Sequence, residues 1–472
     1  MRFNSAEYIL LLTVVFILYN VFRGSRERKL LLIAASAVFY ASWSVGYLFM
    51  FHGVMLANYL LVRRMGTDPG RKRLYLIAAV AFDLAVLGGF KYTNFLIGSV
   101  FGLLMLARAE VSVPHYGIVL PLAISFYTFQ IMSFAIDYYR GAFTERPGYV
   151  NFVFYVSFFP QLIAGPIVRC GEFFGQKLFK PFSMKDMDAG LRLILLGMFQ
   201  KVVIADNLGV FVDAAYENPW SQNTISAALC MYGYALQIFF DFAGYTNIAR
   251  GSARLFGIVL PENFRSPYLA ANMADFWRRW HMTFSRWLRD YLYIPLGGSR
   301  VARAAVYRNL LVTMVLGGVW HGAAWTFALW GVYHGALLMA TRFYRETVGA
   351  VVPLEKMKNS VPLKALGVFA TFTLAGFGFI IFRSGTFGDC AGMVSALFRW
   401  TPGAWGGIEP YLDSDVPKIL LLYLGYSLLS MRFDVSAFLN QRRRFLLYAL
   451  IALVTLAFMP KRLTQPFIYF QF

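Results

Sequence analysis

The ionisable residue that stands out is His321, which lies in the apolar stretch LLVTMVLGGVWHGAAWTFALWGVYHG. A titratable side chain inside a membrane is costly, so it indicates a functional site by default. The alternative is a histidine that only hydrogen-bonds a neighbouring helix, and the motif leaves both interpretations open. The chain has four other histidines, which are His52, His115, His281 and His334.

Small and aromatic residues surround His321. The flanking glycines and alanines leave room for close approach by a helix or a thin ligand, and Trp320, Trp325 and Trp330 could wall a channel. The same residues could equally be packing contacts. His334 lies 13 residues further along, which is about 220° around a continuous helix. His334 is therefore expected to face elsewhere and to be structural.

His281 lies in a segment of interleaved aromatic and arginine residues, Asp275–Tyr293. At about 100° per residue the aromatic side chains share one arc and the arginines lie on the other side. The pattern predicts an interfacial amphipathic helix, with its rings in the acyl boundary, or a membrane anchor with no further role. His281, between the two faces, could orient a substrate or contact water. The aromatic residues are Trp280, Phe284, Trp287 and Tyr291, and the arginines are Arg278, Arg279, Arg286 and Arg289.

A second polar cluster lies in the apolar sequence YALQIFFDFAGYTNIARG. The four-residue spacing of Gln237, Asp241 and Tyr245 places three polar groups on one helix face. A carboxylate there is costly unless it is paired or hydrated. The cluster could contact a substrate, or it could be an interhelical hydrogen-bond network.

Long apolar runs must position these residues. Hydrophobic residues make up 58% of the 472 residues and charged residues only 14%, whereas a soluble domain has about 25% charged residues. A helix needs about 20 apolar residues to span a bilayer. The runs predict an all-α, polytopic membrane bundle of roughly ten to twelve spans, with re-entrant and interfacial helices. We expect one membrane-embedded domain over residues 1–472, because no stretch has the composition of a soluble domain.

Charge and cysteine content exclude several classes of function. The net charge of +20 comes largely from basic residues in short loops between apolar runs, as the positive-inside rule predicts, so we expect contact with membrane lipid and no nucleic acid. Cys170, Cys230 and Cys390 are far apart and have neither metal-site nor disulfide spacing. We therefore expect no bound metal.

Eight ordered motifs give the chain a family resemblance. They are FKYTNF, LPLAISFYTFQIMSFAIDYYRG, FFPQLIAGPIVR, KVVIADN, DFAGYTNIARG, ENFRSPY, FWRRWHMTFSRWLRDYLYIPLGG and RNLLVTMVLGGVWHGAAWTFALWGVYHG, with the core between residues 90 and 335. The chain resembles the membrane-bound O-acyltransferase family, and specifically its bacterial alginate O-acetylation branch. Ala243 and Asn247 stand where members of the family commonly have Ser and Asp.

The resemblance implies a set of site residues. The active-site histidine of the family corresponds to His321, and its second histidine corresponds to His281. The implied fold is a helical bundle around a tunnel, for which Trp320, Trp325, Gln237, Asp241 and Tyr245 are candidate lining or substrate residues. The implied acyl donor is acetyl-CoA, whose phosphates Arg278, Arg279 and Arg300 could hold. Topology and lipid headgroups explain these arginines equally well.

The resemblance also implies a location and partners. We expect a multi-pass protein of the bacterial inner membrane that acts on an exported polysaccharide together with a periplasmic acetyltransferase partner. His321 would act as general base toward the attacking hydroxyl. The alternatives are an enzyme of the same family that supports D-alanyl transfer to teichoic acid, and a non-enzymatic transporter or flippase. In a transporter, His321 and Asp241 would relay protons.

Overall fold

The structure is a computed structural model of the chain. It describes residues 1–107, 112–143, 147–163, 165–347, 360–401, 418, 421, 441–458 and 467–468. Every regular element in this described part is a helix, so the predicted all-α class is confirmed. The chain forms two compact units, residues 1–194 with 246–261 and residues 195–245 with 262–472. The expectation of one domain stays a prediction.

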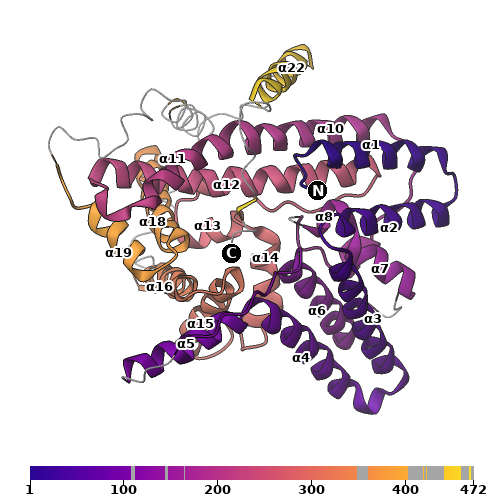
Figure 1. Ribbon diagram of the computed structural model, residues 1–472, viewed down its shortest axis with the longest axis horizontal. Helices are drawn as coiled ribbons and strands as arrows, with labels where there is room; N and C mark the ends of the chain where they lie inside the picture. The colour runs from indigo at the N-terminus through magenta and orange to yellow at the C-terminus, as the bar shows by residue number, and fades with distance from the viewer. Residues whose placement is uncertain are drawn as a thin grey trace. The chain divides into compact units, whose positions relative to one another are not determined.

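In its described residues, the first unit is built from ten consecutive helices and parts of two further ones. Helices α3, α4 and α6 pack side by side within it (Figure 1). The helices are α1 (Ala6–Val21), α2 (Ser25–Ala41), α3 (Val45–Thr67), η1 (Pro69–Arg71), α4 (Lys72–Lys91), α5 (Thr93–Leu106), α6 (Ile124–Arg140), α7 (Tyr149–Ser157), α8 (Phe159–Leu162) and α9 (Cys170–Phe174). Two further helices, α10 (Met184–Met198) and α12 (Thr224–Leu255), each contribute residues to both units.

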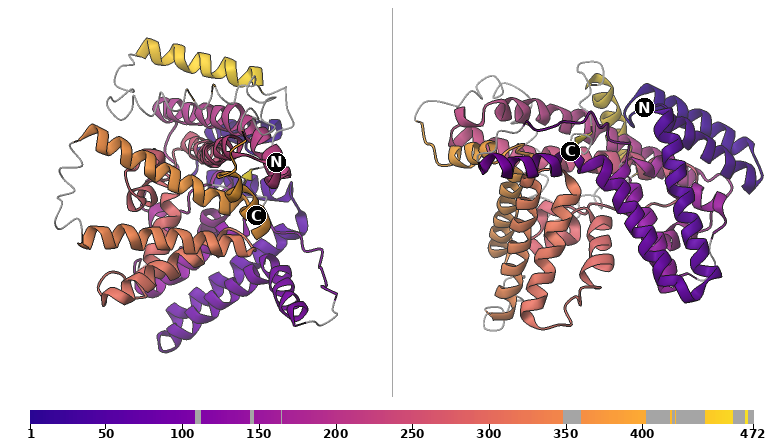
Figure 2. Two further views of the ribbon diagram at one scale, coloured as in Figure 1. Left: turned by 90° about the vertical axis from the view of Figure 1, so that its left-hand side faces the viewer. Right: turned by 60° about the horizontal axis from the view of Figure 1, so that its bottom comes forward.

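The second unit carries both histidines expected to act in catalysis. Helices α15 and α16 form an antiparallel hairpin in it, and α18 packs against α16 (Figures 1 and 2). Its helices are the π-helix η2 (Phe199–Ala205), α11 (Asp206–Glu217), η3 (Pro219–Ser221), η4 (Pro267–Leu269), α13 (Met273–Arg279), α14 (Met282–Leu288), the π-helix η5 (Arg289–Tyr293), α15 (Arg303–His321), α16 (Trp325–Thr347), α18 (Val361–Arg383), α19 (Phe387–Ala396) and α22 (Gln441–Phe458).

Five helical segments of the described residues are long and apolar enough to cross a membrane. They are Val45–Thr67, Pro69–Lys91, Met184–Glu217, Thr224–Leu255 and Val361–Arg383. Their backbone groups are satisfied within the helix, as a bilayer requires. Large apolar side chains also face outward, including Phe49 at 73% and Leu366 at 63% exposure, which suits lipid and not water. The total of roughly ten to twelve spans stays a prediction.

Some polar groups at helix starts and inside the helices have hydrogen-bond partners within the protein. Ser44, before α3, accepts a hydrogen bond from the backbone N–H of Tyr47, which caps the helix. Asn58 of α3 donates to the buried carboxylate of Asp83 on α4 at 2.6 Å. This contact joins two candidate spans through a polar pair where an unmatched group would be costly.

The prediction of one continuous amphipathic helix over Asp275–Tyr293 is wrong. The chain breaks at Trp280 and His281, between α13 and α14. Trp280, Phe284 and Trp287 are 2%, 1% and 6% exposed, so they pack inside the protein and not in the lipid acyl boundary. A helical period places apolar residues on one face whether that face meets lipid or a protein core. The sequence pattern alone does not distinguish the two environments.

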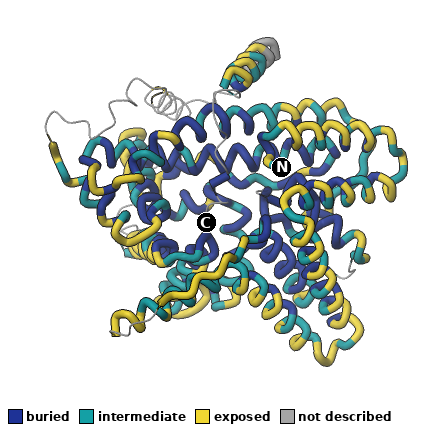
Figure 3. The backbone as a smooth tube through the Cα atoms, viewed as in Figure 1, coloured by how far each residue is buried: buried dark blue, intermediate teal, exposed yellow. Residues whose placement is uncertain are grey.

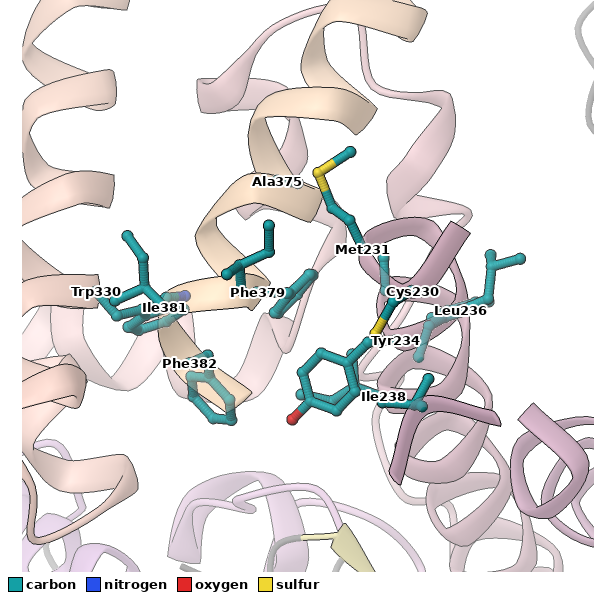
Figure 4. Packing of buried hydrophobic residues seen from close by; sticks show 14 of the residues in the cluster. Cys230, Met231, Tyr234, Leu236, Ile238, Trp330, Ala375, Phe379, Ile381 and Phe382 are labelled. Carbon is teal, nitrogen blue, oxygen red and sulfur yellow. The ribbon is translucent and has the colours of Figure 1, made fainter. Parts of the chain in front are cut away.

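The core of the second unit is formed around α12. This helix is largely buried along its length (Figure 3). Tyr234 of α12 lies 6.3 Å from Phe379 of α18 between ring centroids. Trp330 of α16 packs on Phe382 of α18 at 5.3 Å (Figure 4). Aromatic rings of α12, α16 and α18 therefore build one continuous apolar interior.

Candidate active site

His321 is the last residue of α15, where the helix stops. The next residue, Gly322, has extended backbone, and a side chain there would collide with the ring of Phe327. Glycine therefore permits the tight break that separates α15 from α16. His321 is buried, with 3% of its surface exposed.

Four aromatic rings surround His321. The centroids of Trp320 and Trp330 lie 5.0 and 5.2 Å from the imidazole centroid. Those of Phe284 and Phe382 both lie at 5.3 Å. These rings come from α14, α15, α16 and α18. The enclosure excludes bulk water, and electrostatic interactions are stronger in such a low-dielectric setting.

His281 occupies the turn between α13 and α14 in the left-handed backbone region, with φ of 39°. This region is rare for residues other than glycine and costs about 1–3 kcal/mol. Asn263 holds the turn: its carbonyl accepts from the N–H of Met282 at 2.9 Å, and its side-chain oxygen accepts from the hydroxyl of Thr283 at 2.6 Å. A rare backbone conformation held by buried contacts is typical of functional sites.

The structure brings the two histidines together, although they are 40 positions apart in the sequence. Their ring centroids are 6.4 Å apart. Phe284 contacts both, stacked on His281 at 4.9 Å and tilted against His321 at 5.3 Å. Two buried imidazoles in one aromatic enclosure can accept and return a proton away from bulk water.

Burial lowers the pKa of His281, which lies outside the five candidate spans, from 6.5 to about 3. The unfolded chain therefore binds more protons between these pH values, so stability is full above pH 6.5 and falls as the pH falls. At pH 5 the loss is about 2 kcal/mol. We expect detergent-solubilised protein to melt at a lower temperature at pH 5 than at pH 8, with a smaller difference for His281→Gln. An equal difference in both proteins would contradict this account.

The Gln237–Asp241–Tyr245 face of α12 meets a buried lysine. The ammonium of Lys201 lies 2.6 Å from Asp241 and 2.8 Å from Asp206, and 5.7 Å from the centroid of the Tyr245 ring. The expectation that Asp241 needs a partner is therefore met within the protein. Gln237 is half-buried, and its side-chain oxygen accepts no hydrogen bond from the described residues.

The three arginines expected to hold phosphates do not share one set of contacts. Arg278 and Arg279 both bond to Asp275, at 3.3 and 2.9 Å, and the Arg278 side chain is 66% exposed. Arg300 is exposed in the loop after η5. That these three arginines bind phosphate stays a prediction.

Of the three tryptophans expected to wall a channel, Trp320 and Trp330 lie at the site. Trp320 is 4% exposed and contacts His321, whereas Trp325, at the start of α16, is 57% exposed. Phe284 and Phe382 are also neighbours of His321 and were not predicted from the sequence. No feature of the apolar pattern distinguishes these two rings from the rest of the core.

His334 lies closer to the site than the sequence suggested. The prediction assumed a continuous helix from His321, but the chain turns back between α15 and α16. The His334 ring lies 4.7 Å from Trp330, which in turn contacts His321. Within the described residues, neither ring nitrogen of His334 has a hydrogen-bond partner.

Glycines allow α15 and α16 to meet backbone to backbone. A side chain at Gly331 would lie 2.5 Å from the carbonyl oxygen of Met314 and 2.6 Å from the Cα of Val315. We expect Gly331→Ala to destabilise the protein by about 1–3 kcal/mol through overpacking, measured as a lower melting temperature. The control is Gly88→Ala in α4, where an added methyl group meets no heavy atom within 4 Å. An unchanged melting temperature for Gly331→Ala would contradict this packing.

Comparisons with known proteins identify the family to which the chain belongs. A family model described as membrane-bound O-acyltransferase matches residues 140–382, which include His281 and His321. A probable alginate O-acetylase of Pseudomonas aeruginosa is 38% identical over 412 residues, covering 86% of this chain and 76% of its own length. The chain belongs to the membrane-bound O-acyltransferase family. The resemblance inferred from its motifs is confirmed.

Other relatives within the family differ in the acceptor that their names give. The peptidoglycan O-acetyltransferase of Helicobacter pylori is 37% identical over 416 residues, covering 81% of this chain and 77% of its own length. The teichoic acid D-alanyltransferase of Bacillus subtilis is 27% identical over 334 residues, covering 66% and 83%. Family membership makes this chain a membrane-embedded acyltransferase.

Proposed function

We propose that this chain is an inner-membrane O-acetyltransferase that uses acetyl-CoA from the cytoplasm for O-acetylation of an exported polysaccharide such as alginate. The observation that carries the proposal is the pair of buried histidines, His281 and His321, inside one aromatic enclosure. The two O-acetyltransferase relatives, at 38% and 37% identity, support acetyl as the transferred group. The D-alanyltransferase relative, at 27% identity, matches less well.

His321 acts as the general base in the proposed reaction. The acceptor hydroxyl attacks the thioester carbonyl, its proton passes to the imidazole of His321, and a new C–O bond forms. The C–S bond then breaks, and the CoA thiolate takes the proton back from the imidazolium. The products are an acetyl ester and free CoA, so atoms and charge balance. His281, neutral in its buried turn, orients the reacting groups.

The donor and the partner complete the proposal. Arg278, Arg279 and Arg300 contact the phosphates of acetyl-CoA, for which guanidinium groups are well suited. A periplasmic acetyltransferase partner delivers the acetyl group to the polymer. Membrane lipid surrounds the helices, whose exposed apolar side chains supply the necessary surface.

The proposal is tested with purified protein in liposomes given acetyl-labelled acetyl-CoA, a periplasmic partner and a soluble polysaccharide. We expect alkali-labile label on the polysaccharide and an equal amount of free CoA, only when the chain is present. A parallel reaction supplies D-alanine on its carrier protein. Transfer of D-alanine in place of acetyl would overturn the proposal in favour of the teichoic acid branch. Movement of polysaccharide without either transfer would favour a transporter.

A further inference from the structure

A buried ion cluster lies in the second unit, apart from the residues that surround His321. The side chain of Lys201 is 1% exposed, and those of Asp206 and Asp241 are 7% and 3% exposed. Removing such charges from water costs several kcal/mol per ion. Apolar residues of the same size would often be as stable, so packing alone does not account for the cluster.

Local helix geometry presents Lys201 to Asp241. Lys201 lies in the π-helix η2, which widens the turn between α10 and α11, and π-helical turns are frequent at functional sites. Gly244 of α12 faces this turn. A side chain at Gly244 would lie 2.8 Å from the carbonyl oxygen of Gly197 and 3.1 Å from the backbone nitrogen of Lys201. The two helices therefore meet at backbone contact, which brings the ammonium onto the carboxylate.

A distant segment of the chain docks on this cluster. The backbone N–H of Ile468 donates to Asp241 at 2.7 Å, across 227 positions of sequence. The preceding residue, Phe467, is fully buried and stacks on Tyr245 with centroids 4.4 Å apart. Asp241 thus uses one oxygen for Lys201 and the other for the docked segment.

The side chain of Phe242 lies between the docked segment and His281. Phe467 packs edge-on against Phe242 at 5.6 Å, and Phe242 packs edge-on against the imidazole of His281 at 4.7 Å. Close-packed side chains have few alternative positions, so Phe467 holds Phe242 in place against His281. Without the Phe467 ring, Phe242 could move, and the face of His281 that it contacts would lose this support.

We propose that the Lys201–Asp241 pair is the receptor for the Phe467–Ile468 segment, and that the docked segment positions His281 through Phe242. Phe467 and Asp241 are then positioning residues, since they act through another side chain. The effect on acetyl transfer rests on the function proposed above. The docking itself does not.

Docking is tested by thiol labelling of Ile468→Cys with a maleimide in detergent. The backbone N–H is kept in this variant, and the three native cysteines are buried. We expect slow labelling that rises at least about tenfold when Asp241→Ala is added, because docking protects the thiol. The matched control is Asp83→Ala, which removes another buried carboxylate, hydrogen-bonded by Asn58, and leaves labelling slow.

A second variant covers the risk that Asp241→Ala fails to fold. Phe467→Ala leaves the ion pair intact and removes the stacking on Tyr245, so it also raises labelling of Ile468→Cys. Equal labelling rates with and without these substitutions would overturn the docking proposal.

The effect on the site is read from transfer kinetics of the full chain. For Phe467→Ala we expect kcat to fall at least about tenfold, which is about 1.4 kcal/mol in the barrier, with an unchanged KM for acetyl-CoA. Phe467→Tyr keeps a stacking ring and restores kcat. An unchanged kcat for Phe467→Ala would overturn the positioning role. If wild-type protein transfers no acetyl group, the proposed function is wrong. The labelling experiment would still show whether the Phe467–Ile468 segment docks on Asp241.

Discussion

Replacing His321 with glutamine is expected to lower the initial rate of acetyl transfer in membrane vesicles by about 10²–10⁴-fold, the usual contribution of a general base. Glutamine keeps a polar side chain of similar reach but takes no proton from a hydroxyl. Because His321 is enclosed by four aromatic rings, bulk water does not replace it easily. Binding of acetyl-CoA should change little, since the lost interaction forms in the transition state.

His334→Gln is the matched control for this result. His334 is also fully buried, also lies at the α15–α16 hairpin and also contacts Trp330. Its substitution should therefore perturb packing to a similar degree without removing the base. An equal loss of rate in both variants, at equal membrane abundance, would show that the effect comes from packing. Full activity of His321→Gln would exclude its role as base.

Replacing Lys201 with methionine is expected to destabilise the protein by about 3–5 kcal/mol, because it leaves two buried carboxylates without their cation. Asp206 and Asp241 lie 2.8 and 2.6 Å from the ammonium. Methionine has a volume similar to that of lysine, so the loss of stability comes from the missing charge and not from a cavity. The measurement is the melting temperature of purified protein, together with its abundance in the membrane.

Arg383→Met is the control for this substitution. Arg383 pairs with Asp213 at 2.8 Å, but their side chains are 25% and 38% exposed. Solvent screens such a pair, so its loss should cost about 1 kcal/mol or less. A Lys201→Met protein as stable as Arg383→Met would show that the buried cluster is not held by this lysine.

Helix positions followed closely from the apolar runs of the sequence. One apolar run of the sequence, Leu74–Phe90, corresponds to α4, and another, Ala365–Phe382, corresponds to α18, each within a few residues. In a bilayer the backbone must bond to itself, so a long apolar run has few alternatives to a helix. The breaks were harder to predict: the run Leu310–Met339 forms parts of two helices that separate at Gly322.

The environment of each apolar face could not be predicted in the same way. Trp280 was expected in the lipid boundary, yet it is 2% exposed and stacks on Phe276 at 5.5 Å. Lipid and protein core select the same side chains at the same spacing. The left-handed turn at His281 was equally hidden, because only a few per cent of non-glycine residues adopt positive φ, even though histidine is enriched among them.

Long-range pairs were predicted only in part. The sequence indicated that Asp241 needs a partner, but Lys201 lies 40 positions earlier and Ile468 lies 227 positions later. Helical spacing describes neighbours on one helix face and carries no information about a different helix. The family resemblance identified His281 and His321 as the two histidines of the family, and spacing alone left each with a structural alternative. That their ring centroids lie 6.4 Å apart was not predicted.

The most direct test of the acyltransferase account is the O-acetyl content of polysaccharide secreted by cells that carry either wild-type protein or His321→Ala at equal membrane abundance. The account predicts that acetyl content collapses in the variant while polymer export continues. Unchanged acetylation would contradict the role of His321 in transfer. Loss of polymer export itself would point to a transporter.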